Sequence, residues 1–125
     1  MTEALAFTEE MCIVWGVADG MTIIRLRPIS DGRVELYEIL NGEIVGVLQA
    51  SPHRRVIINL EQVRDLSSQM LGILAALYRR VSSPGGVVAV CGLGDEAERI
   101  IRLTRMDTLL RVFPDEAAAR KALAQ

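Results

Sequence analysis

The sequence predicts an α/β domain built on a mostly parallel sheet, and three observations support this prediction. The chain has 125 residues, half of them apolar, which suits one globular domain spanning residues 1–125. After an N-terminal hairpin pattern, strand-like and helix-like segments alternate in the order β-β-α-β-α-β-α-β-α. Two short runs, Val56–Leu60 and Val87–Cys91, are almost continuously apolar, as in strands covered on both faces. We expect these runs to be adjacent, parallel central strands.

The first two strands are predicted to form a β-hairpin. Residues Met11–Ala18 and Met21–Leu26 are mainly apolar, and Asp19-Gly20 separates them. Asp-Gly between two apolar runs indicates a tight turn, because both residues tolerate a positive φ. The hairpin should contribute one antiparallel edge strand. Residues 1–10 carry three glutamates and no basic residue, so we expect a loose N-terminal segment there and no signal peptide.

A helix is predicted over residues 33–49. Its apolar residues recur at helical spacing, and its glutamates are expected on the outer face. Gly42 and Gly46 each weaken it by about 1 kcal/mol unless a neighbour packs close to them. The turn sequence that begins at Ser51 ends it. The inward set is Leu36, Ile39, Leu40, Ile44, Val47 and Leu48, and the outward set is Glu35, Glu38 and Glu43.

The second predicted helix begins at a pair of serines. Ser67 or Ser68 can cap it, because a serine oxygen accepts a free backbone N–H at a helix N-terminus. A phosphate is also tolerated at such a position, which makes it suitable for a regulatory switch. The apolar stripe of this helix consists of Met70, Ile73, Leu74, Leu77 and Val81.

Two more helices bring the predicted number to four. Asp95 with Glu98 has the spacing of a capping box, with Asp95 as the cap of the third helix. A short strand is predicted over Leu109–Phe113. Asp115 is positioned to cap the last helix.

Composition and spacing exclude several classes of function. The net charge of -2 and the pI near 5.4 argue against broad nucleic-acid binding. No run approaches the roughly 20 apolar residues of a membrane span. Cys12 and Cys91 lie far apart and are expected to be small buried hydrophobes in a reducing, cytoplasmic compartment. Because His53 is a lone histidine and zinc, EF-hand and HExxH spacings are missing from the sequence, we expect neither a metal nor a cofactor.

The segment Gly92–Ala97 matches GxGxxA, a pattern of dinucleotide-binding turns. Asp95 and Glu96 would repel a pyrophosphate at the same helix N-terminus, and too little chain follows to complete such a site. We therefore expect a tight turn from strand to helix. Since the sequence contains no set of residues typical of catalysis either, an enzyme is not expected.

From about residue 11 to residue 123, the chain resembles the STAS domain, the fold of anti-sigma factor antagonists. That family has Asp-Leu-Ser-Gly at a strand end and then Asp-Ser-Ser/Thr-Gly-Leu-Gly at a helix start. The corresponding residues here are 59–62 and 67–72, followed by a Gly-Gly turn at 85–86. Residues 103–107 resemble the family's Leu-Thr-Gly-Leu-Asp stretch. The resemblance implies a STAS-like fold.

The functional motif departs from the family pattern. In a gap-free alignment, Asn59 and Ser67 replace the two aspartates, and Gln69 stands at the residue that family kinases phosphorylate. Gln69 has no hydroxyl group to accept a phosphoryl group. With a one-residue insertion, Asp65 would match the second aspartate and Ser68 the phosphoacceptor. The gap-free alignment is preferred, because the loop already matches the family without the insertion.

The resemblance implies a non-catalytic module that docks on an anti-sigma factor of the serine-kinase-like ATPase class. In the family, the contact surface is the loop before the second helix together with the first turns of that helix. Two alternatives stay open: an accessory subunit of an ABC-type transporter, and a small nucleotide-binding protein that uses the GxGxxA turn. The expected partner-binding residues are Arg64, Asp65, Ser67, Ser68, Gln69, Met70 and Ile73.

Overall fold

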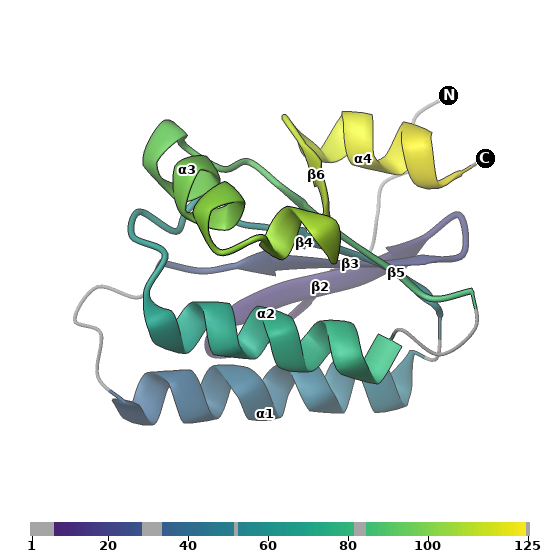
Figure 1. The fold of residues 1–125 in the computed structure, drawn as a ribbon. Helices are drawn as coiled ribbons and strands as arrows, with labels where there is room; N and C mark the ends of the chain where they lie inside the picture. The colour runs from purple at the N-terminus through teal and green to yellow at the C-terminus, as the bar shows by residue number, and fades with distance from the viewer. Residues whose placement is uncertain (1–6, 29–33, 52, 82–84, 125) are drawn as a thin grey trace.

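The computed structural model describes residues 7–28, 34–51, 53–81 and 85–124. Within these ranges the chain forms a mixed sheet in the strand order β1-β2-β3-β4-β5-β6, with helices on both faces (Figure 1). The strands are β1 (Thr8–Glu9), β2 (Ile13–Ala18), β3 (Met21–Leu26), β4 (Arg55–Asn59), β5 (Val87–Cys91) and β6 (Arg111–Phe113). The helices are α1 (Val34–Ala50), α2 (Ser68–Val81), α3 (Asp95–Leu103), the 3₁₀ helix η1 (Met106–Thr108) and α4 (Glu116–Leu123).

The predicted central strands are confirmed. Strands β4 and β5 are parallel neighbours, with Val56 opposite Val88. All residues from Val56 to Ile58 and from Val88 to Cys91 are at most 1% exposed, so both faces of these strands are covered. Because β3 and β6 continue the parallel pairing on either side, the carboxyl ends of four strands lie at one edge of the sheet.

The predicted hairpin is also confirmed. Strands β2 and β3 pair antiparallel, and the turn residues Asp19 and Gly20 have φ values of 54° and 73°. Both values are positive, as a two-residue hairpin turn requires. The short outer strand β1 was not predicted. Of the segment expected to be loose, residues 1–6 lie outside the described ranges, whereas Thr8 and Glu9 pair with the outer edge of β2.

The helices divide the core into two layers. Helices α1 and α2 lie side by side across one face, and α4 covers the other (Figure 1). The larger core, to which α3 and η1 also contribute, contains Ile24, Val56, Ile58, Leu74 and Ile101. The smaller core, beneath α4, contains Met21, Ile23, Ile57, Ala89, Cys91, Ala119 and Leu123.

The cysteines are buried and free, as predicted. Cys12 lies in the larger core and Cys91 in the smaller. Burial raises the pKa of the Cys91 thiol to about 12, because the thiolate would lose its hydration inside the core. The Cys91 thiol is therefore protonated at neutral pH.

Two residues of α1 do not lie as predicted. Glu43 was expected on the outer face, but its carboxylate accepts hydrogen bonds from the backbone N–H groups of Met11 and Cys12, at 2.9 and 2.8 Å. It satisfies two donors at the start of β2 that no strand pairs. Ile39 was expected to face inward, and it is 37% exposed. Its exposure follows from the position of α1 near the edge of the sheet, where no helix covers its outer side in the described residues.

The predictions for the third helix and the last strand also need correction. The N-cap of α3 is Gly94, without a side-chain cap, and Asp95 is the first helical residue. Because Asp95 lies inside the first turn, its carboxylate interacts favourably with the positive end of the helix dipole but makes no capping hydrogen bond. Residue Leu109 follows η1, and β6 begins at Arg111. The predicted cap of α4 is confirmed, because Asp115 Oδ1 accepts a hydrogen bond from the Ala118 N–H at 2.8 Å.

Candidate partner-binding site

The candidate site lies at the carboxyl end of β4, in the loop that leads into α2. The Asn59 side chain accepts a hydrogen bond from the Glu61 N–H at 2.9 Å, and Val63 N–H donates to the Leu60 carbonyl at 2.9 Å. Leu60 is 1% exposed and joins the loop to β5 through a hydrogen bond to the Cys91 carbonyl. These bonds turn the chain sharply away from the sheet and hold the start of the loop in place.

Gly92, at the end of β5, packs against this loop. A Cβ atom at Gly92 would lie 2.9 Å from the Glu61 nitrogen, and the φ of Gly92 is +77°. Both the close approach and the positive φ favour glycine. The first glycine of the GxGxxA pattern therefore has a structural role, which agrees with the expected tight turn.

Ser67 caps α2, which confirms one of the two predicted caps. Its Oγ accepts a hydrogen bond from the Met70 N–H at 3.1 Å and donates to the Tyr37 Oη at 3.0 Å. The first bond satisfies one of the free donors at the helix N-terminus. The second bond joins the start of α2 to α1. The loop and the first turn of α2 are thus tied to both the sheet and the neighbouring helix.

The predicted contact residues divide into an exposed and a buried group. Met70 and Ile73 are 2% and 8% exposed, because they lie on the apolar stripe of α2 that faces the sheet. They are therefore left out of the contact surface. The apolar spacing of α2, already visible in the sequence, was the signal that placed them inside. The exposed group is Arg64, Asp65, Ser68 and Gln69, with Ser67 half-buried at their centre.

A second polar cluster lies beside Asn59 on the opposite face of the sheet. Arg25 donates two hydrogen bonds to the Glu116 carboxylate, at 2.9 and 2.7 Å, and its guanidinium lies 4.1 Å from the centre of the Phe7 ring. Hydrogen bonding from Arg25 lowers the pKa of Glu116, although burial opposes this shift. This cluster lines a surface hollow of about 400 Å³ that also includes Glu61. Sequence reasoning missed it, because Arg25 and Glu116 are 91 residues apart.

The site contains no arrangement typical of metal binding. Among residues 7–28, 34–51, 53–81 and 85–124, no group of three His, Cys, Asp or Glu side chains could hold a metal ion. At the GxGxxA turn, the Glu96 carboxylate pairs with Arg99 at 3.0 Å. Hydrogen bonding to Arg99 lowers the pKa of Glu96, so this carboxylate is ionised in the first turn of α3.

Comparison with known proteins defines the family. The model of the STAS domain matches residues 18–119. The anti-sigma F factor antagonist of Paenibacillus polymyxa is 19% identical over 100 residues, which cover 80% of this chain and 84% of the relative. This chain belongs to the STAS domain family.

Solved structures show the same fold. An anti-sigma factor antagonist from Mycobacterium paratuberculosis superposes with a TM-score of 0.75 at 25% identity, over 96% of both chains. An anti-sigma-factor antagonist (STAS) domain protein from Planctomyces limnophilus has a TM-score of 0.78 at 21% identity, over 90% of this chain and 98% of that one. Within the described part of the chain, none of the helices has the length and apolarity to cross a membrane.

Proposed function

We propose that this chain is a non-catalytic, cytoplasmic regulatory module of the anti-sigma factor antagonist type. It docks on an anti-sigma factor of the kinase-like ATPase class through the turn that carries Arg64, Asp65, Ser67, Ser68 and Gln69. The observation that supports this proposal is the exposed polar surface of the turn on a firmly held backbone. The names of the relatives support the functional class.

The turn is suited to binding because little of it has to become ordered on contact. Leu66 is 6% exposed and anchors the middle of the loop in the core, between the exposed Asp65 and the capping Ser67. The hydrogen bond from Ser67 to Tyr37 fixes the same segment from the side of α1. A surface that is already ordered loses less conformational entropy on binding, so more of its contact energy contributes to affinity.

The proposed module is not switched by phosphorylation at the family position. Gln69 is exposed, neutral and without a hydroxyl group, so it corresponds to a surface that stays unmodified. Ser68 is the fallback acceptor. It is exposed at the first position of α2, and among the described residues its hydroxyl contacts only Gln69 Oε1, at 3.5 Å. Ser67 is less accessible, because its hydroxyl is bonded to both Tyr37 and the Met70 N–H.

A binding assay with a variant that introduces a charge at the proposed surface tests this function. Each kinase-like anti-sigma factor encoded in the source genome is purified and titrated with the chain, and ABC-type ATPases are titrated in parallel. We expect one anti-sigma factor to bind with a Kd of about 1 μM or tighter. Gln69→Glu adds a negative charge to the proposed surface and should weaken binding at least tenfold.

The matched control is Gln49→Glu, at an exposed position on the other end of the helical layer. It makes the same chemical change and should leave affinity within about twofold of the wild type. Binding to no anti-sigma factor, or equal weakening by the two variants, would contradict the proposal. Tight binding to a transporter ATPase instead would support the accessory-subunit alternative.

A further inference from the structure

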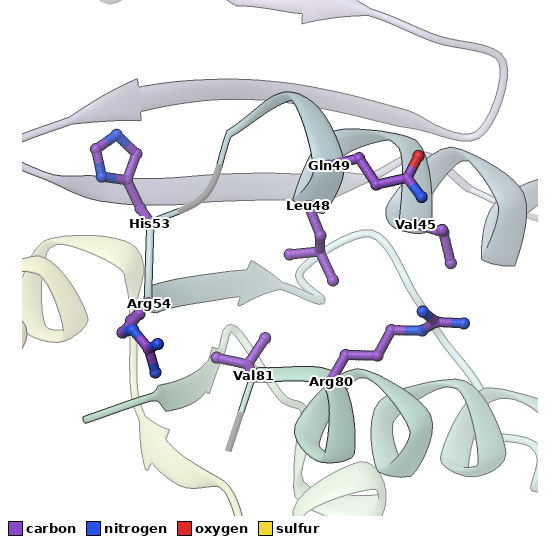
Figure 2. A pocket seen from close by; sticks show the side chains of 7 residues that line it. All are labelled: Val45, Leu48, Gln49, His53, Arg54, Arg80 and Val81. Carbon is purple, nitrogen blue, oxygen red and sulfur yellow. The ribbon is translucent and has the colours of Figure 1, made fainter. Parts of the chain in front are cut away.

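A cavity lies between the C-terminal ends of α1 and α2, away from the proposed partner-binding site. It has a volume of about 290 Å³. Figure 2 shows Leu48 and Val81 pointing toward one another, with Arg54 on one side and the Arg80 side chain extending along the other. The complete lining is Val45, Leu48, Gln49, His53, Arg54, Arg80 and Val81.

The lining combines an aliphatic floor with a cationic rim. Val45, Leu48 and Val81 supply the floor, and the guanidinium groups of Arg54 and Arg80 supply the charge. None of the lining residues carries a carboxylate. Among the described residues Arg80 has no hydrogen-bond or ion-pair partner, so its guanidinium has its donors available to a ligand.

The helix ends oppose this positive charge only in part. The last turns of α1 and α2 end at the cavity, and each helix C-terminus carries roughly half a negative charge. Arg79 stands in the last turn of α2 beside Arg80 and offsets that end from outside the cavity. The full charge of Arg80, whose donors have no partner among the described residues, exceeds the half charge at either helix end, so the rim at Arg80 attracts an anion.

We propose that this cavity binds a small amphiphilic carboxylate, with its carboxylate on Arg80 and a short aliphatic body on Val45, Leu48 and Val81. A guanidinium fits a planar carboxylate with two parallel N–H···O bonds, and the amide of Gln49 is a further donor on the rim. The floor excludes water from the aliphatic part of the ligand. This site lies at the opposite end of α2 from the turn that carries Gln69, and its existence does not depend on the proposed function.

The size and lining of the cavity disfavour other ligand classes. About 290 Å³ lies at the small end of ligand pockets, which suits a body of about five or six carbons. The lining has no phenylalanine, tyrosine or tryptophan ring on which a nucleobase could stack. A cationic ligand would face the Arg80 guanidinium, and no lining residue carries a carboxylate to bind the ligand's charge.

Titration followed by NMR tests the proposal on the full chain. The probes are hexanoate, its neutral analogue hexanol and its cationic analogue hexylamine, each at physiological ionic strength. Hexanoate should bind saturably with a Kd of about 1 mM or tighter, and at least fivefold more tightly than the other two. Its shifts should be largest at residues 45–49, 53–54 and 80–81.

Three variants test separately how much the charged rim and the aliphatic floor contribute to hexanoate binding. Arg80→Gln should weaken hexanoate binding about tenfold, since a hydrogen bond to a charged group is lost. The matched control Arg79→Gln lies one residue away, outside the lining, and should change affinity less than twofold. Val45→Thr keeps the side-chain shape but makes the floor polar, and it should weaken hexanoate binding about threefold.

Three results would overturn the assignment. The first is no saturable binding of hexanoate up to 10 times the expected Kd. The second is equal binding of hexanol or hexylamine. The third is an Arg80→Gln variant that keeps wild-type affinity while its thermal melt shows a folded protein.

Discussion

Replacement of Ser67 by alanine tests how the proposed partner-binding turn is held in place. The Ser67 hydroxyl makes two bonds with different functions: it accepts the Met70 N–H at 3.1 Å and donates to the Tyr37 Oη at 3.0 Å. Ser67→Ala removes both bonds and leaves the Met70 N–H without its side-chain partner. The neighbouring Ser68 is exposed, and within the described part of the chain its hydroxyl makes only a 3.5 Å contact with Gln69, so the same substitution there removes little.

The expected cost follows from these two bonds. Loss of a serine N-cap costs about 1 kcal/mol, and loss of a partly buried hydrogen bond between hydroxyl groups costs about 0.5–1 kcal/mol. Ser67→Ala should therefore lower the free energy of unfolding by about 1.5–2 kcal/mol. At about 4 °C per kcal/mol for a chain of this size, the Tm should fall by about 6–8 °C. Ser68→Ala should cost less than about 0.5 kcal/mol.

Urea denaturation of five proteins measures these terms: the wild type, Ser67→Ala, Tyr37→Phe, the double variant of these two, and Ser68→Ala. Tyr37→Phe removes the bond to Tyr37 but leaves the cap, and it should cost about 0.5–1 kcal/mol. The two substitutions share one bond, so their effects should fall short of additivity by about that amount. The reasoning fails if the effects are fully additive, or if Ser68→Ala costs as much as Ser67→Ala.

Three further predictions concern charge, backbone and modification. Arg25 lowers the pKa of Glu116, so the pair stabilises the fold above the ordinary glutamate pKa of about 4.5, and this contribution disappears as the pH falls through the lowered value. Because Arg25 is 41% exposed, Glu116→Gln should lower the free energy of unfolding, measured by urea denaturation at pH 7, by only about 0.5–1 kcal/mol. This difference between variant and wild type should shrink toward pH 3, and a difference that does not change with pH would contradict the prediction. Gly92→Ala should cost at least about 2 kcal/mol by the same assay, whereas Gly72→Ala, in open space on α2, should be neutral or stabilise by up to about 1 kcal/mol. Incubation with the cognate ATPase and ATP should leave the intact mass unchanged, and Gln69→Ser should restore acceptance of one phosphate; a stoichiometric phosphate on the wild type that releases the partner would refute this.

The parts of the fold that depend on local patterns could be predicted from the sequence. The apolar runs at β4 and β5 and the Asp19-Gly20 turn each carry their signal within a few residues. The caps at Ser67 and Asp115 do so as well, because a cap bonds a backbone group three residues away. In contrast, Asp95 has the spacing of a cap but lies one residue inside its helix, and helix boundaries are set by packing as well as by local pattern.

Contacts between residues that are far apart in the sequence could not be predicted from it. Glu43 looked like a solvent-facing residue of α1, since nothing near it in the sequence indicates the backbone donors of Met11 and Cys12. The pair of Arg25 and Glu116 joins elements that only the folded sheet brings together. At the proposed partner-binding turn, the position of the candidate site came from the family pattern, whereas its division into exposed and buried residues needed the three-dimensional structure.

The contacts around β2 also bear on self-association. Ile13–Ala18 is an uncharged, mainly apolar strand, a composition that readily pairs with other copies when its edge is open. Here β1 covers that edge opposite Val14 and Trp15, and the Glu43 carboxylate occupies the two N–H groups just before the strand. The two paired residues of β1 and the Glu43 carboxylate thus leave fewer backbone groups at this edge free to pair with a strand of another copy. A chain trimmed of β1 would keep the buried strands β3 to β5, yet it would expose this edge and become prone to aggregation.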